Sequence, residues 1–218
     1  MSKSQVKPRD SQSALFPPQE RTVREAIEAR YSISLFQKTP VPDEEILDIL
    51  HLTSLAPSGW NLQPWRFIIV KDASTRSLLS KAAYGQIQIA SAPITIVLYS
   101  DMAQTLATLE EVIPPTMPPE KRASYQQDIQ HNFELMSEQE RGSWSMNQCH
   151  IALAYLTLAA STLGYDTSIV GGFDQSQAKA ILNLSKHVFI APLVALGKAA
   201  ISGYPRHRLP LYRLVSHS

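Results

Sequence analysis

The stretch APSGWNLQPWRFIIV, residues 56–70, carries most of the information about the fold of this chain. Its second half is a run of β-branched and aromatic residues after Pro64, which predicts a buried strand over residues 65–72. Its first half places hydroxyl and amide side chains between Pro57 and Pro64, and such a loop before a core strand is typical of a binding segment. A well-capped turn that only joins a helix to the strand is the alternative interpretation.

On both sides of this stretch, segments with apolar residues at helical spacing alternate with short, continuous apolar runs that are typical of buried strands. The pattern predicts helices over residues 21–31, 43–55, 74–84, 143–163 and 175–184, and further strands over residues 93–101, 167–172 and 188–198. Four prolines interrupt residues 103–140, where two helices with a proline-broken join are expected. The chain is therefore expected to adopt an α+β (mixed α/β) fold, in which helices cover a central sheet.

The composition is that of a globular protein. Of 218 residues, 44% are apolar and 18% are charged, so one domain over residues 21–218 is expected, preceded by a flexible extension over residues 1–20. Twenty Lys and Arg against nineteen Asp and Glu leave a net charge of +1, which argues against nucleic acid or an anionic membrane as a partner. The N-terminal residues lack the apolar core of a signal peptide, so a cytoplasmic location is expected.

The sequence lacks the residues and motifs that several common kinds of active or binding site require. Cys149 is the only cysteine, which excludes an internal disulfide and a multi-cysteine metal cage within one chain. There is no GxGxxG motif, no P-loop and no HExxH spacing, so neither a Rossmann turn nor a catalytic metal is supported. No Ser-His-Asp or Cys-His signature points to a nucleophile, and no catalytic acid or base is assigned.

Arginines and hydroxyls recur in two short segments that lie far apart in the sequence. Arg30 precedes Ser32 and Ser34 at the end of the first expected helix, and Arg206 and Arg208 alternate in the C-terminal tail. Such groups bind phosphate through charge-assisted, bidentate hydrogen bonds. The two segments predict a local anion site in a near-neutral protein, and the alternative is that these arginines are solvated surface charges.

Five segments follow one another in an order that is characteristic of a known family. They are AIEARYSIS (26–34), APSGWNLQPWRFIIV (56–70), AAYGQIQIASAP (82–93), IVGGFD (169–174) and RHRLP (206–210). Together they resemble the nitroreductase family of flavin-dependent oxidoreductases, and the resemblance covers residues 22–215. It implies a nitroreductase-like FMN-binding fold whose C-terminal tail reaches a partner subunit.

The resemblance also implies which residues contact FMN. They are Arg30, Tyr31, Ser32, Ser34, Pro57, Ser58, Asn61, Gln86, Gly171, Gly172, Arg206 and Arg208. The arginines and Ser32 correspond to phosphate and ribityl contacts, Gln86 to the edge of the flavin ring, and the glycine pair to the backbone beside that ring. The loop with Pro57, Ser58 and Asn61 corresponds to one that reaches the flavin from the second subunit of a homodimer.

The activity implied by the resemblance is that of an oxidoreductase. NADH or NADPH would pass hydride to flavin N5, and a nitroaromatic, a quinone or a similar electrophile would then take the electrons in the same cavity. Two alternatives remain at this point. One is a flavin-binding or redox-sensing module without significant turnover, and the other is a specialised family member that acts on one dedicated substrate.

One position departs from the family pattern. Where relatives commonly have Lys or Arg two residues after the serine of the first segment, this chain has Ser34. In the family that cation lies near flavin N1 and O2, where negative charge accumulates when the ring is reduced. A serine hydroxyl donates a hydrogen bond but supplies no charge, so a lower flavin reduction potential than in relatives with the cation is expected.

Overall fold

The computed structural model describes residues 20–204 and 206–217. The expected N-terminal extension therefore lies outside the described residues except for Glu20, as does Pro205 at the start of the C-terminal tail. In the part of the chain that is described, no helix is long and apolar enough to cross a membrane.

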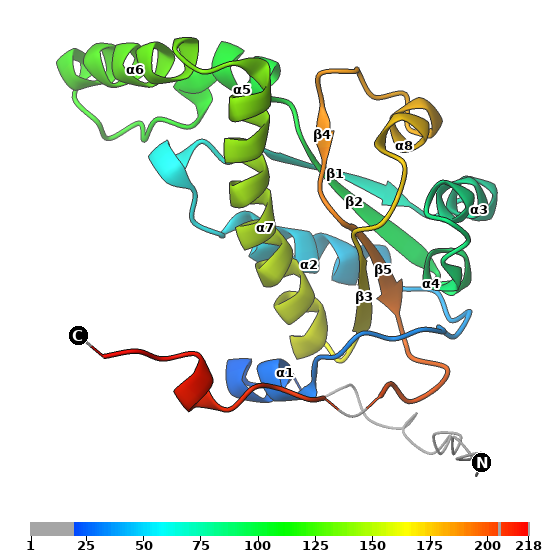
Figure 1. Ribbon diagram of the computed structural model, residues 1–218. Coiled ribbons are helices and arrows are strands. Elements are labelled where there is room, and N and C mark those ends of the chain that lie inside the picture. The colour runs from blue at the N-terminus through cyan, green and yellow to red at the C-terminus, as the bar shows by residue number, and fades with distance from the viewer. Residues whose placement is uncertain (1–19, 205, 218) are drawn as a thin grey trace.

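A single antiparallel sheet forms the centre of the domain (Figure 1). Its strand order is β1-β2-β5-β3, with a short strand β4 that also pairs with β2. The strands span Trp65–Val70 (β1), Ile94–Ser100 (β2), Asp166–Val170 (β3), Phe189–Ile190 (β4) and Leu193–Gly197 (β5). In the register, Trp65 lies opposite Ser100 and Asp166 lies opposite Gly197. The expected α+β fold is confirmed.

Helices cover both faces of this sheet (Figure 1). They span Val23–Ala29 (α1), Asp43–Ser54 (α2), Ala73–Ala82 (α3), Ile87–Ser91 (α4), Met102–Ala107 (α5), Pro119–Glu134 (α6), Glu138–Thr162 (α7) and Gln175–Ile181 (α8), with 3-10 turns at Gly59–Asn61 (η1), Leu109–Glu111 (η2) and Leu211–Arg213 (η3). One buried cluster packs α2 and α7 on one face, and a second packs α3, α4 and α8 on the other.

The ends of α7 are specified by the sequence around them. Ser137 and Glu140 form a capping box, in which each side chain accepts a hydrogen bond from the other residue's backbone N–H. At the other end Gly164 has a φ of 73°, a left-handed conformation that glycine adopts without steric cost. The 25-residue helix between these caps is the longest element beside the sheet.

Three local expectations differ from the structure. The helix expected over residues 143–163 begins earlier, at Glu138, because the capping box at Ser137 sets its start. The strand expected over residues 188–198 is divided into β4 and β5, because Pro192 has no N–H to donate to a neighbouring strand. The short helix α4 was not expected, because its five residues are too few to show a helical period.

Residues 102–136 form a separate lobe beyond the sheet, and α6 lies at its outer edge (Figure 1). Its own hydrophobic cluster joins Ile129 and Phe133 of α6 to Met102, Leu109 and the fully buried Leu62. Because Leu62 directly follows η1, this lobe packs against the end of the loop that the sequence singled out. We call residues 102–136 the cover lobe. Residues 57–63 are called the flavin-contact loop, after the contact that the family resemblance implies for them.

Candidate functional site

The three arginines that the sequence singled out lie close together. Arg30 is the C-cap residue of α1, and the tail brings Arg206 and Arg208 near it. Burial lowers the pKa of Arg30, and the positive charges of Arg206 and Arg208 lower it further. Three like charges repel one another, so an anion bound among them would remove that repulsion. The concentration of positive charge suits a phosphate group.

The tail is fastened to the first helix through one of these arginines. The guanidinium of Arg206 donates to the backbone oxygen of Ile27 over 3.1 Å and also to that of Glu28. These are terminal carbonyls of α1, which have no partner within the helix and favour a cation. Arg208 donates instead to the carbonyl of His207 over 2.7 Å. Arg206 therefore has a structural contact as well as a place in the arginine cluster.

The serine segment lies at the edge of the sheet next to this cluster. Ser32 forms an isolated parallel bridge with Thr167 in β3, and the N–H of Ile33 donates to the carbonyl of Thr167 over 3.3 Å. Ile33 is buried and half-buried Tyr31 packs beside it, whereas Ser32 and Ser34 are exposed. The buried residues fix the backbone and leave both hydroxyls accessible to a ligand.

A hydrogen bond joins two further expected site residues. Gln86, the N-cap residue of α4, donates from Nε2 to the carbonyl of Gly172 over 2.8 Å. The backbone carbonyl of Gln86 accepts a hydrogen bond from the Ser80 hydroxyl over 2.8 Å, and this bond holds the turn before α4. Gly171 and Gly172 follow β3 and expose their backbone, and a Cβ atom at Gly171 would come no closer than 3.9 Å to Pro192. The structure therefore brings Gln86 and the glycine pair together.

The flavin-contact loop lies elsewhere in the chain. Figure 1 shows the segment between α2 and β1 (cyan) beside the cover lobe and α7, whereas α4 lies on the other side of the sheet. The N–H of Gly59 donates to Oε1 of Gln148 in α7 over 2.9 Å, and Nδ2 of Asn61 donates to the carbonyl of Val112 over 3.0 Å. Pro57, Ser58 and Asn61 thus form a second group, separate from the other expected site residues.

The backbone of this loop is strained. Trp60, Asn61 and Gln63 have φ angles of 57°, 55° and 44°, in the left-handed region that non-glycine residues avoid. Asparagine tolerates this region, but a residue such as Trp60 or Gln63 costs about 1 kcal/mol or more there unless its surroundings hold it. A hydrogen bond of 3.0 Å from the N–H of Gln63 to the hydroxyl of Ser58 holds the loop from within.

Sequence reasoning missed several residues that hold the loop from outside. Gln148 and Trp144 project from α7, and a Cβ atom at Gly59 would lie 2.9 Å from the Trp144 ring. Tyr125 of α6 donates its hydroxyl hydrogen to the carbonyl of Trp60 over 3.2 Å. Helical spacing does not reveal these contacts, since only the fold brings α6 and α7 to the loop. A polar Gln148 ahead of an apolar run is the one local sign.

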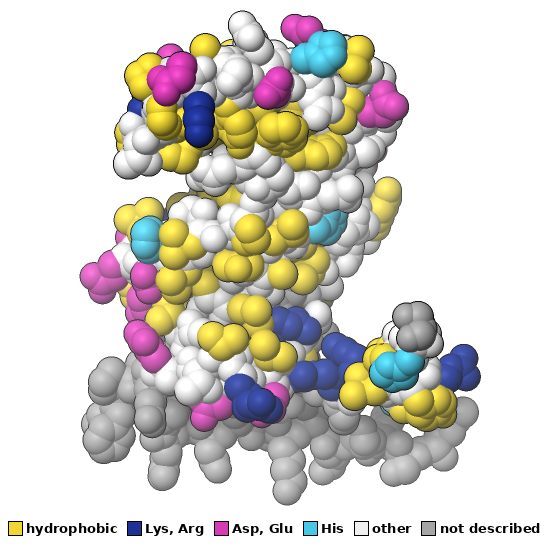
Figure 2. All heavy atoms as spheres, turned by 90° about the vertical axis from the view of Figure 1, so that its left-hand side faces the viewer, with side chains coloured by type: hydrophobic (Ala, Val, Ile, Leu, Met, Phe, Trp, Pro, Cys, Tyr) yellow, Lys and Arg dark blue, Asp and Glu magenta, His cyan; other side chains and the backbone are white. Residues whose placement is uncertain are grey.

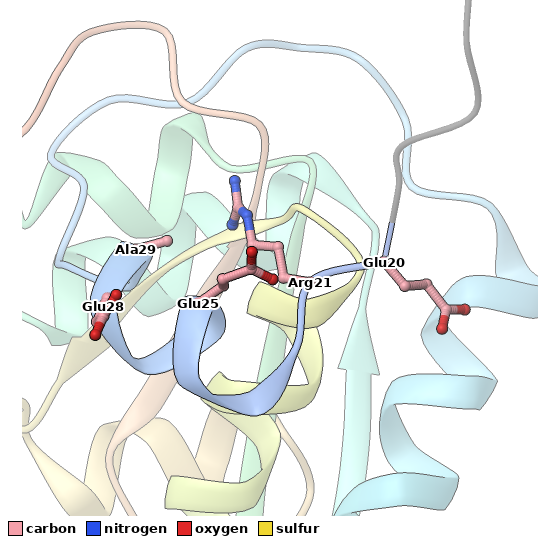
Figure 3. Close-up of a pocket in the computed structure, with 5 residues that line it drawn as sticks. All are labelled: Glu20, Arg21, Glu25, Glu28 and Ala29. Carbon is pink, nitrogen blue, oxygen red and sulfur yellow. The ribbon is translucent and has the colours of Figure 1, made fainter.

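Other titratable groups do not form a competing site. Cys149 is fully buried, and burial raises the pKa of its thiol to about 12, so this thiol is structural. Within residues 20–204 and 206–217, no three His, Cys, Asp or Glu side chains are placed to hold a metal ion. A hollow of about 480 Å³ beside α1 is lined by Glu20, Arg21, Glu25, Glu28 and Ala29 (Figure 3). Its carboxylates do not suit a phosphate.

The family model and the sequence relatives point to the same protein family. The model of the nitroreductase family matches residues 27–198. A protein named NADH dehydrogenase from Thermus thermophilus is 44% identical over 186 residues, which cover 85% of this chain and 91% of that protein. An oxygen-insensitive NADPH nitroreductase from Helicobacter acinonychis is 26% identical over 194 residues, with 86% and 92% of the two chains covered.

Solved structures agree with these sequence relatives. A protein from Exiguobacterium sibiricum, described as a nitroreductase in complex with FMN, superposes with a TM-score of 0.84 at 26% identity and covers 93% of this chain and 100% of its own. A nitroreductase family protein from Streptococcus pneumoniae gives a TM-score of 0.82 at 25% identity, with 90% and 100% covered. The expected fold is confirmed, and the chain belongs to the nitroreductase family.

Proposed function

We propose that this protein is an FMN-dependent NAD(P)H oxidoreductase that works as a homodimer and reduces nitroaromatics, quinones or related electrophiles. The observation that carries the proposal is the division of the expected site residues into two groups within one chain. A second copy of the chain would supply the flavin-contact loop that the first group lacks. Family membership and the FMN-bound relative support the cofactor and the enzyme class.

Each group of residues has a distinct task toward the cofactor. Arg30, Arg206 and Arg208 would hold the phosphate, and Ser32 would hold the ribityl chain. Gln86 and the backbone of the glycine pair would orient the ring from one side. Bound FMN would supply the hydride and electron transfer, so the protein's part is orientation, charge and exclusion of water. No residue is needed as a nucleophile.

Exposed apolar side chains support the homodimer. Ile151 and Tyr155, four residues apart on α7, are 38% and 41% exposed, and Leu52 of α2 and Leu55 directly after that helix are 36% and 63% exposed. Figure 2 shows hydrophobic side chains gathered across the face that α2 and α7 present. A helix that has apolar residues on two opposite faces is stable in water only when both faces are buried against other protein. We propose that the same face of a second chain provides it.

The C-terminal tail points to the same arrangement. After Arg208 the tail exposes Leu211, Tyr212 and Leu214, and it extends beyond the body of the domain (Figure 1). Apolar residues on an extended segment gain stability only when a surface covers them. We propose that the tail packs on the partner subunit, and that the dimer resides in the cytoplasm, where NADH and NADPH are available.

Anaerobic reduction tests the proposed activity. NADH or NADPH should bleach the absorbance of the bound flavin near about 450 nm, and a quinone, a nitroaromatic or an enone should restore it. The rate with each acceptor defines the substrate class, and restoration by a single compound would identify a specialised enzyme. If FMN binds but neither nicotinamide bleaches it, the protein is a flavin-binding module and the proposed activity is wrong.

Replacing Ser34 by lysine should raise the flavin reduction potential. Ser34 is exposed beside the arginine cluster, so a lysine there can extend toward a bound ligand and add a positive charge that favours the reduced cofactor. We expect an increase of tens of millivolts, since about 30 mV corresponds to about 1.4 kcal/mol for a two-electron couple. Ser34→Gln is the uncharged control, and an equal shift in both variants would contradict a charge effect.

A further inference from the structure

The cover lobe and the flavin-contact loop are joined at the most strained part of the loop. The Tyr125 hydroxyl donates to the backbone carbonyl of Trp60. The centroids of the two rings lie 5.7 Å apart, and the ring planes are inclined at 58° to each other. Trp60 is itself the residue with a φ of 57°. The bond from α6 therefore acts on a backbone conformation that a non-glycine residue would otherwise leave.

Two neighbouring contacts join the same two parts of the chain. Asn61 donates from Nδ2 to the carbonyl of Val112, and Leu62 is fully buried among Ile129 and Phe133 of α6. Three successive loop residues are thus held by the cover lobe. A displacement of α6 would strain or break the contacts of Trp60 and Leu62, and the Asn61 bond ties the same turn to the end of η2.

The side chain of Asn61 is also oriented by this arrangement. Because one hydrogen of its Nδ2 is bonded to the carbonyl of Val112, Oδ1 and the second N–H of Nδ2 remain to interact with a ligand. Pro57 and Ser58 precede the same strained turn, and Ser58 is bonded to Gln63 across it. The orientation of all three expected flavin contacts in the loop therefore depends on how the turn at Trp60 is held.

We propose that Tyr125 is a positioning residue for FMN, which holds the flavin-contact loop in its binding conformation and thereby couples the position of α6 to the affinity for the cofactor. The proposal rests on the proposed function, because the loop's contact with flavin is part of it. Tyr125 acts through the carbonyl of Trp60. The cover lobe would consequently be better ordered with FMN bound than without it.

The Tyr125→Phe variant tests this role because it removes the hydroxyl and keeps the ring. A net hydrogen bond contributes about 0.5–1.5 kcal/mol, so we expect the Kd of FMN, measured by fluorescence titration of the apoprotein, to rise about two- to tenfold. The visible circular dichroism of the bound flavin should also change, since it reports local geometry. Tyr125→Leu, which removes the ring contact as well, should weaken binding further. Tyr99→Phe, a half-buried tyrosine of β2, is the matched control and should bind like the wild type.

Limited proteolysis of the cover lobe measures the coupling itself. FMN should slow cleavage within residues 112–119 of the wild type, and this protection should be smaller in Tyr125→Phe. Thermal unfolding of each apoprotein checks that the variants are folded. If Tyr125→Phe is folded and retains the wild-type Kd, spectrum and protection, the positioning role is wrong while the proposed function stands. If the wild type itself fails to bind FMN, the proposed function is wrong and this inference falls with it.

Discussion

Replacing Arg30 by alanine is expected to weaken FMN binding by about ten- to a hundredfold, because hydrogen bonds to a charged group contribute about 1.5–3 kcal/mol. Arg30 is partly buried at the end of α1, between the sheet edge and the tail, and its charge already interacts with those of Arg206 and Arg208. Among the described residues, the charges that act on Arg30 are those of the two tail arginines, so its guanidinium would be available to a bound phosphate. Fluorescence titration of the apoprotein with FMN measures the effect.

Riboflavin and a neighbouring arginine provide the controls for this experiment. Riboflavin has the same ring but no phosphate, so the Arg30→Ala variant should lose little affinity for it relative to the wild type. Arg24→Ala removes a highly exposed arginine of the same helix, which pairs with Glu28 over 3.7 Å, and should bind FMN normally. Equal losses for FMN and riboflavin would show that Arg30 is not a phosphate ligand.

Placing glutamates at both Ile151 and Tyr155 should separate the proposed dimer and release the flavin. Both side chains are partly exposed on the α2–α7 face, so the single chain should tolerate the charges. At an interface the same carboxylates would be buried without partners, at a cost of several kcal/mol. We expect the dimer Kd to rise by more than about a hundredfold. Sedimentation velocity and retained flavin absorbance measure the two effects.

The control for this variant is Leu78→Glu, which changes an exposed apolar residue of α3 on the opposite side of the sheet. It should remain dimeric and keep its flavin. Thermal unfolding shows whether the double variant is folded. A folded monomer that still binds FMN as tightly as the wild type would contradict a flavin site shared between two chains.

Most of the fold could be predicted from the sequence because its elements carry strong local signals. The apolar run of β1 after Pro64 and the glycine that ends α7 depend on neighbouring residues alone. The capping box at the start of α7 is an equally local signal, but it was missed, because the helix was expected to begin at residue 143. The break between β4 and β5 was missed, since an apolar run does not show where pairing ends. The order of the strands likewise depends on contacts between distant segments, which periodicity does not encode.

The structure shows which of the expected site residues lie together, and this arrangement was only partly predictable from the sequence. Arg30 and Arg206 are separated by most of the chain, and their approach follows from the bond between Arg206 and the carbonyls of α1. The support of the flavin-contact loop by Gln148 and Tyr125 was not predictable, because a glutamine or tyrosine on a helix has no distinctive spacing. The left-handed turn at Trp60 was hidden for a similar reason, since such conformations are usually marked by glycine.

Because Cys149 is unreactive in the folded protein, a new cysteine can be labelled selectively without removing the native one. As the only cysteine, fully buried and with a pKa of about 12, it should not react with maleimides while the protein is folded. A cysteine introduced at Tyr212, which is 79% exposed on the tail, would then carry a single fluorophore or spin label. Distances between two such labels would report directly where each tail lies in the assembled protein.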